Sequence, residues 1–184
     1  MSLRARITLL SSVVLLFAGA ALGASDPAAA APRPATTVAA ADHVITVLGA
    51  GPYRIGTSLN RLSAAGLLGW VTDPDGAGTQ FAGSAGTWSG ELILTFHHSV
   101  LVELETDTGS VRTAAGARVG MSFAEVESVY HGYGDRITND QGRTAYVVPV
   151  GPMVVLLGDH PIRPGVGSIQ VGPAWITLRA FLNG

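Results

Sequence analysis

A short segment of this chain occurs twice. Arg54–Leu62 (RIGTSLNRL) aligns with Arg118–Val126 (RVGMSFAEV), and the alignment keeps Arg, Gly and Ser at equivalent positions. Self-similarity of this kind is typical of proteins built from copies of one supersecondary unit. The repeat therefore predicts two tandem modules, and it constrains the architecture more than any single motif does.

The N-terminal residues have the pattern of a bacterial export signal. Arg4 and Arg6 precede the apolar run Ile7–Leu22, and small residues follow it. The run is shorter than the roughly 20 apolar residues of a membrane-spanning helix. We expect residues 1–24 to be a secretory signal peptide and the mature protein to be secreted, extracellular or cell-wall-associated, without a membrane span. Retention of this segment as an anchor is the alternative.

The next segment, 25–41, consists mainly of Ala, Pro and Thr. It offers too little apolar surface to offset the entropy lost on ordering, so we expect a disordered tether. The chain contains no cysteine, which excludes disulfides and a lipoprotein-type lipid attachment. Stability must therefore come from packing alone.

Charge argues against a nucleic acid partner. All 11 basic residues are arginines, they are scattered singly, and the formal net charge is −2. Nucleic acid binding requires a concentrated basic face. We therefore expect no nucleic acid to bind this chain.

Two α+β modules are expected, the first at 42–112 and the second at 113–184. Ser122 and Glu125 have the spacing of a capping box, which predicts a helix that begins at Ser122 and ends at the glycines near Tyr133. Ser58 is the equivalent cap in the first module. The expected fold class is α+β, with two tandem repeats, each a helix followed by a small antiparallel β-sheet, that together form one saddle-like sheet.

The clearest strand pattern lies in the first module. Glu91–Phe96 and Val100–Thr106 alternate in polarity and are separated by a short loop, which predicts a hairpin. Alternation places Leu92, Leu94 and Phe96 on one face. On the return strand it places Val100, Val102 and Leu104 together and leaves Glu103 and Glu105 toward water. Trp175–Leu178 is expected to form a further strand.

The start of the second module resembles a known family. Gly120–Val126 (GMSFAEV), with Tyr133-Gly134 after the helix, resembles the signature of SmpA/OmlA-type assembly lipoproteins. A tandem pair of such modules resembles the plan of the secreted β-lactamase inhibitory proteins. This resemblance implies a fold and a tendency to bind other proteins. The chain lacks the cysteines of both groups, and the resemblance does not carry over inhibitor activity.

No motif in the chain predicts catalysis, a metal site or a cofactor. Val47–Gly51 lacks the third glycine of a dinucleotide-binding loop, and Asp73–Gly78 lacks the ligands that complete a calcium loop. Adjacent histidines on a strand point to opposite faces, so His97 and His98 are poorly placed to hold one ion. We therefore expect no catalytic residue, no metal and no cofactor.

Aromatic surface is the remaining functional material. We expect Trp70 and Trp175 to be core, and we predict that Trp88, Tyr133, His97 and His98 contact a partner. Trp88 lies in a segment of small residues, and Tyr133 lies between glycines. Aromatic side chains on rigid edges are typical binding anchors because they bring contact area at little entropy cost.

The sequence thus predicts a monomeric, non-catalytic protein that binds another extracellular or envelope protein, or a cell-wall component, through its sheet face and aromatic loops. One alternative is a specific inhibitor of a secreted enzyme, which would present a protruding loop such as Pro74–Gly78 or His97–Ser99. The other is a small metal-dependent hydrolase, which would gather His, Asp and Ser in a deep pocket.

Overall fold

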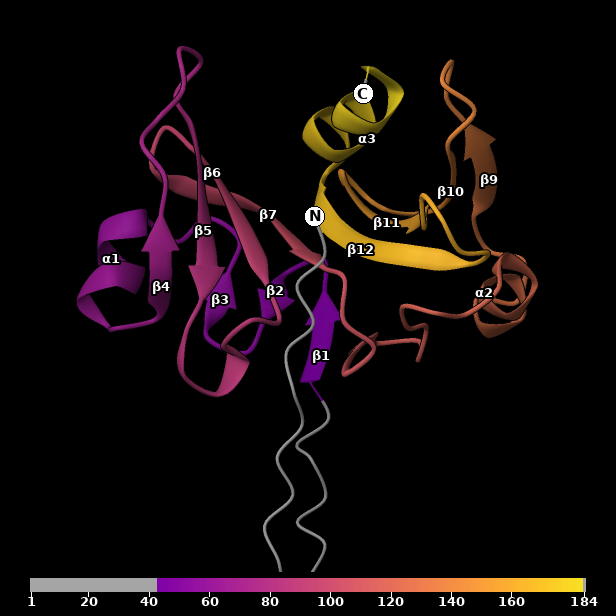
Figure 1. The fold of residues 1–184 in the computed structure, drawn as a ribbon, viewed down its shortest axis with the longest axis horizontal. Helices are drawn as coiled ribbons and strands as arrows, with labels where there is room; N and C mark the ends of the chain where they lie inside the picture. Colours follow the sequence, from indigo (N-terminus) through magenta and orange to yellow (C-terminus); the bar gives the residue numbers. More distant parts are fainter. Residues whose placement is uncertain (1–42, 184) are drawn as a thin grey trace, which may run out of the picture. The chain divides into compact units, whose positions relative to one another are not determined.

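A computed structural model describes residues 43–183 (Figure 1). The expected signal peptide and tether lie outside these residues. The described part contains no helix that is long and apolar enough to cross a membrane.

In the described residues the chain forms twelve strands, three α-helices and one short 3-10 helix. The helices are α1 (Leu59–Ala64), α2 (Phe123–Val129), α3 (Ala174–Asn183) and the 3-10 helix η1 (Gly86–Trp88). The strands are β1 (His43–Thr46), β2 (Gly49–Ala50), β3 (Tyr53–Arg54), β4 (Leu68–Val71), β5 (Thr79–Ser84), β6 (Ile93–His97), β7 (Val100–Thr106), β8 (Val111–Thr113), β9 (Asp135–Thr138), β10 (Thr144–Val150), β11 (Met153–Asp159) and β12 (Val166–Pro173).

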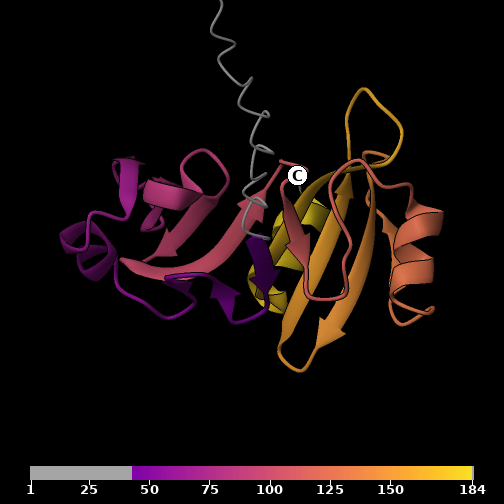
Figure 2. The same ribbon diagram turned by 90° about the horizontal axis from the view of Figure 1, so that it is seen from below.

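Two sheets organise these strands. The larger has eight strands in the order β4-β5-β6-β7-β12-β11-β10-β9, and the smaller has the order β3-β2-β1-β8. Pairing in the larger sheet is antiparallel throughout, and β7 pairs with β12 at its middle. In the smaller sheet β1 runs parallel to β8, the indigo and salmon strands of Figure 2.

The expected fold class is therefore wrong. The protein is mostly β, with two sheets and only short helices, and not a pair of repeats that each combine a helix with a small sheet. The helices α1 and α2 span only 6 and 7 residues. Each ends just before residues with positive φ, Gly66 after α1 and His131 and Gly132 after α2. These positions stop the helices early, so most of the chain between them is free to enter strands.

The predicted capping box is present in α2. The Ser122 hydroxyl accepts from the Glu125 N–H at 3.3 Å, and the Glu125 carboxylate accepts from the Ser122 N–H at 2.7 Å. In α1 the Ser58 hydroxyl accepts from the Arg61 N–H at 3.4 Å, without a reciprocal carboxylate. Both predicted helix starts are therefore confirmed.

The hairpin of β6 and β7 contains a β-bulge that the sequence pattern did not indicate. Thr95 pairs with Glu103 while Phe96 pairs with Leu101, so Val102 is the extra residue. Leu92, Leu94 and Phe96 are buried together as predicted, but the return strand buries Leu101, Leu104 and Glu103. Glu103 lies on the face opposite the main core, as alternation predicts, but the expectation that it faces water is wrong, because α3 covers it there and Thr177 of α3 donates a hydrogen bond to its carboxylate. The bulge brings Leu101 as well as Leu104 to the core side of the strand.

The larger sheet has a core on each face. Its main core contains Leu94, Phe96, Tyr146 and Ile169, together with residues of α1, α2 and the smaller sheet. On the opposite face, Ala145, Val147, Val154 and Leu156 form a second cluster.

Helix α3 covers that second cluster. Ala174, Leu178 and Phe181 pack against it, and α3 contacts β11, β12 and β7 (Figure 1). These three residues recur at helical spacing, which explains why Trp175–Leu178 is helical and not the strand that we expected.

Candidate binding face

The part of the α3-bearing face that belongs to β4, β5 and β6 is left uncovered by the described helices. Phe81, Ile93 and Thr95 point to this side, because the intervening residues Ala82 and Leu94 lie in the main core. Phe81 is 44% exposed and Ile93 is 38% exposed. We call the surface formed by Trp70, Phe81, Ile93 and Thr95 the open face.

Trp70 is the largest side chain of the open face. It is 51% exposed, although we expected it to be core. It pairs across the strands with Gly83, and any Cβ at position 83 would overlap the Nε1 end of the Trp70 indole. The missing side chain at Gly83 thus lets the indole lie directly on β5. The Trp70 ring is therefore exposed to solvent on one side and held in position by its contact with Gly83 on the other.

A cleft of about 330 Å³ separates the open face from α3. Thr79, Thr95 and His97 line it from the strands, and Trp175 and Arg179 line it from the helix. Trp175 is 63% exposed and meets His97 edge-on, with 6.3 Å between the ring centroids. Trp175 was also expected to be core, so both tryptophans assigned to the interior frame this face instead.

Trp88, in contrast, is buried. It is 7% exposed, stacks on His43 with 4.0 Å between centroids and meets Tyr53 edge-on. The glycine at position 51 leaves room for its ring, since a Cβ there would lie 2.6 Å from the indole Nε1. The structure thus corrects the sequence interpretation of Trp88 as a contact residue: its side chain belongs to the core and is not part of the site that we propose.

The other three predicted contact residues lie near the surface but not together. Tyr133 is 61% exposed and its hydroxyl donates to the carbonyl of Pro149 at 3.0 Å, on the side of α2. The rings of His97 and His98 lie with their centroids 4.1 Å apart and their planes tilted by 52° at the tip of the β6–β7 hairpin, where His98 and Ser99 both have positive φ. Of these residues only His97 lines the cleft beside the open face.

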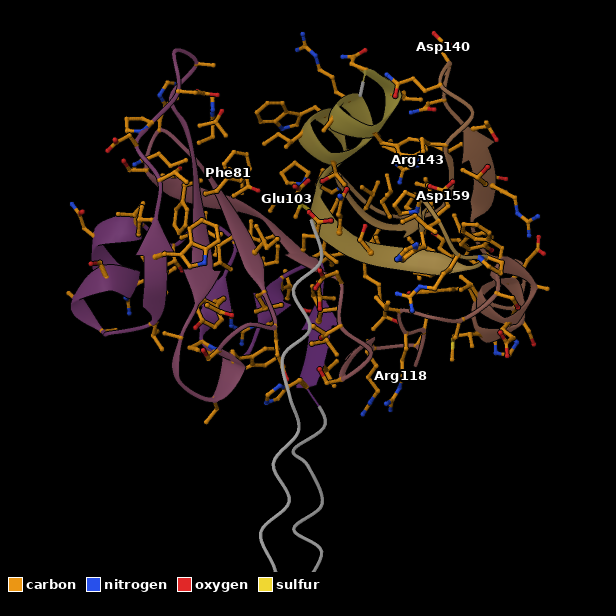
Figure 3. The ribbon with its side chains drawn as sticks, viewed as in Figure 1. Phe81, Glu103, Arg118, Asp140, Arg143 and Asp159 are labelled. Atoms are coloured by element: carbon orange, nitrogen blue, oxygen red, sulfur yellow. The ribbon has the colours of Figure 1, made fainter. Side chains whose placement is uncertain are left out.

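On the other side of α3 lies a polar cleft of about 300 Å³, lined by Glu103, Asn139 and Arg143 among others. Arg143 binds Asp159 at 2.6 Å, and Asn139 donates to the carbonyl of Phe181 at 2.9 Å. Figure 3 shows Arg143 beside Asp159, with Glu103 near the start of α3. Arg143 and Asn139 are thus engaged in holding the fold.

Glu103 is the only acidic residue that is buried among those described, at 8% exposure. Its carboxylate accepts a hydrogen bond of 2.6 Å from the hydroxyl of Thr177 in α3. Burial raises the pKa of Glu103, and the charge of Glu105 acts in the same direction, while hydrogen bonds from Thr177 and Thr95 oppose the rise.

Metal ligands do not cluster in the described residues, where no group of three or more His, Cys, Asp or Glu side chains could hold an ion. The loop Pro74–Gly78, considered above as an inhibitory loop, is braced by Asp75, whose carboxylate accepts from the N–H groups of Ala77 and Thr79. This loop carries no large apolar side chain, so nothing in its structure favours an inhibitory role.

No protein family matches the chain, and no curated protein does. Two solved structures are similar to it. One is an extracellular protein containing a SCP domain from Bacillus anthracis, at 12% identity and a TM-score of 0.47, over 68% of this chain and 46% of that one. The other is a cysteine-rich secretory protein from Staphylococcus aureus, at 12% identity and a TM-score of 0.38, over 66% and 44%.

This chain spans less than half the length of either structure. Both are described as extracellular or secretory proteins, but likeness at this level says nothing about the activity of our chain. Neither structure is described as an SmpA/OmlA-type lipoprotein or a β-lactamase inhibitory protein, and no family matches. The resemblance to those two groups is therefore withdrawn.

Sequence reasoning missed the open face for an identifiable reason. A tryptophan in an apolar segment such as Leu67–Val71 is usually core, and the cue that Trp70 lies outside is its pairing with Gly83. That pairing depends on the register of β4 and β5, which contains an irregularity between Leu68 and Trp70. The glycines at 69 and 83 are visible in the sequence. They indicate where the Trp70 ring can lie against the sheet only once the register between β4 and β5 is known.

Proposed function

We propose that this protein is a secreted, non-catalytic binding protein that holds an extracellular or envelope protein against its open face. The observation that supports this most directly is the unequal covering of one sheet face. Helix α3 packs on β10 and β11 with three apolar side chains, while Trp70, Phe81 and Ile93 on the same face are left exposed.

Exposed apolar surface in a continuous patch is uncommon on a monomeric protein and is typical of interaction sites. Here the patch is anchored by a tryptophan whose indole rests on Gly83. An aromatic ring that is already held in place loses little conformational entropy on binding, so its contact area contributes efficiently to affinity.

The polar cleft supports binding over catalysis as well. A catalytic group has to reach a substrate, whereas Arg143 binds Asp159 and Glu103 binds Thr177. These contacts satisfy the charged groups within the protein. A hydrolase would instead need a nucleophile and a base within hydrogen-bond reach of each other.

The test is photo-crosslinking in the source organism with the full-length chain. A photoreactive phenylalanine analogue replaces Phe81 on the open face, and a matched chain carries it at Leu48, which is 66% exposed in the turn between β1 and β2. We expect a discrete cross-linked protein from position 81 only. The added substitution Trp70→Ala should reduce this product.

Equal cross-linking from positions 81 and 48, or none from position 81, contradicts a binding role for the open face. If Trp70→Ala leaves the product unchanged while the variant secretes and folds normally, the tryptophan is not an anchor.

A further inference from the structure

A second hollow adjoins the open face on the side away from the α3 cleft. Its volume is about 420 Å³, and we call it the acidic pocket. It is lined by Gly69, Trp70, Gly83, Ser84, Ser89, Gly90, Glu91, Leu92, Ile93 and Asp107. Trp70 and Ile93 belong to both the pocket and the open face, so the two surfaces are continuous.

The charge of this pocket has one sign. Its lining contains two carboxylates, Glu91 and Asp107, and no basic residue. Asp107 is exposed, whereas one oxygen of Glu91 is bound by Nδ1 of His43. Glu105 lies directly across from Ile93 on the neighbouring strand and adds negative charge beside the pocket.

No basic residue lines the acidic pocket itself, and the nearby cations lie in other hollows or are engaged. Arg163 and His160 line a separate hollow that shares Asp107 with the acidic pocket. Arg179 lines the cleft at the opposite end of the open face, together with Thr79 and His97. His43 is engaged on Glu91 and stacks on the buried Trp88. A ligand in the acidic pocket would therefore meet an indole and the carboxylate of Asp107.

A pocket lined by both an indole and a carboxylate is a suitable environment for a side-chain cation. The face of tryptophan attracts a guanidinium or ammonium group, and the carboxylate adds a charge-assisted hydrogen bond. The neighbouring Phe81 and Ile93 offer apolar contacts on the same face. The site thus matches a basic side chain flanked by apolar ones.

We propose that the acidic pocket binds an arginine or lysine side chain from an apolar segment of the protein partner. This inference rests on the proposed function and specifies the chemistry of the partner. Charge complementarity selects a protein segment with a cation, and it disfavours an anionic membrane surface or a nucleic acid.

The experiment measures binding of a defined probe to the isotopically labelled secreted chain. The probe is the peptide acetyl-Leu-Arg-Leu-amide, and its matched control carries citrulline, which has the same shape without the charge. The signal is the indole N–H resonance of Trp70, assigned by its disappearance in Trp70→Phe. We expect the arginine peptide to shift this resonance saturably and more strongly at low salt.

Substitutions test the role of the carboxylate. Asp107→Asn should weaken binding of the arginine peptide by roughly threefold or more, the range expected for a partly exposed ion pair. Asp140→Asn, an exposed aspartate in the loop between β9 and β10, should leave it unchanged (Figure 3). Equal binding of the citrulline peptide, no saturable shift, or equal losses in both variants would overturn the inference.

These results are separable from the test of the proposed function. A cross-linked partner from position 81 combined with failure of arginine selectivity would refute the chemistry of the pocket alone. If the cross-linked segment of the partner contains no basic residue, that also refutes it. Absence of any cross-link from position 81 would refute the proposed function itself.

Discussion

The hydroxyl of Thr177 in α3 donates a hydrogen bond of 2.6 Å to the carboxylate of Glu103 in β7. Thr177 is fully buried and Glu103 nearly so. The contact joins the last helix to a strand 74 residues earlier in the chain. Because each group would be left without this partner if the other were removed, the bond helps to specify where α3 sits on the sheet.

Replacing Glu103 by Gln should make stability less dependent on pH. Burial raises the pKa of Glu103, so the folded state holds its proton more tightly than the unfolded chain does. The resulting stability is complete below the ordinary glutamate pKa of about 4.3. It is lost as pH rises through the raised pKa.

Glu103→Gln should therefore be more stable than the wild type at pH 7.5 but not at pH 3.5, because the amide keeps its oxygen for Thr177 and can donate to Thr95. Urea unfolding of both proteins at the two pH values measures this. Each pKa unit of the shift corresponds to about 1.4 kcal/mol. A variant that is equally destabilised at both pH values would show that the charge of Glu103 is not the cause.

Two tryptophan substitutions should lower the free energy of unfolding by very different amounts. Trp88→Ala removes a buried ring between His43 and Tyr53 and should lower the free energy of unfolding by about 3–5 kcal/mol. Trp70→Ala removes an exposed ring and should change it by about 0.5 kcal/mol or less. Chemical denaturation gives both values. Similar losses would contradict the assignment of Trp88 to the core and of Trp70 to the surface.

Gly83→Ala should displace the indole of Trp70. The added methyl group would occupy the space that the Nε1 end of the ring now fills, so the ring would have to move away from β5. We expect the Trp70 indole N–H resonance to shift and its fluorescence to move to longer wavelength. Gly76→Ala, at an exposed loop position with open space around it, is the control. An unchanged Trp70 resonance would contradict the close contact between the Trp70 ring and Gly83.

Ser122→Ala should destabilise the protein more than Ser58→Ala. The first removes one half of a reciprocal capping box and the second a single, longer hydrogen bond. Loss of a serine cap costs about 1 kcal/mol, so we expect that value for Ser122 and less for Ser58. Thermal unfolding of the two variants side by side ranks them. The reverse order would contradict the importance of the Glu125 contact.

Tyr146→Phe should be neutral or stabilising. The Tyr146 ring is fully buried against Tyr130, and among the described residues its hydroxyl has no hydrogen-bond partner. A buried hydroxyl without a partner costs about 1–3 kcal/mol, and phenylalanine keeps the ring while removing that cost. Urea unfolding of the variant decides the sign. A loss of more than about 1 kcal/mol would indicate that a water molecule satisfies the hydroxyl.

Local features of this fold are predictable from sequence because their causes are local. The capping serines and the hairpin around His97–Ser99 follow from residues a few positions apart. The sequence analysis did not predict helix α3, because the adjacent apolar residues Trp175 and Ile176 resemble part of a buried strand. The residues of α3 that pack against the sheet are instead Ala174, Leu178 and Phe181, at helical spacing.

Features that depend on contacts between distant elements were not predictable. Alternation along β7 predicted that Glu103 faces water, and the packing of α3 on that face of the sheet buries it instead. The candidate site shows the same effect. His97 was identified by its residue type, but Trp70 became a surface residue only through its pairing with Gly83. Exposure is decided by contacts between distant parts of the chain.

The pairing of β7 with β12 also has a consequence for how the molecule is assembled. Strands β8 to β11 and helix α2 lie between these two partners in the chain, so the seam of the larger sheet closes only after β12 has been synthesised. Contacts of such long sequence separation form slowly. Until they form, β7 keeps an unpaired edge, and a chain that crosses a membrane during export would complete its sheet only on the far side.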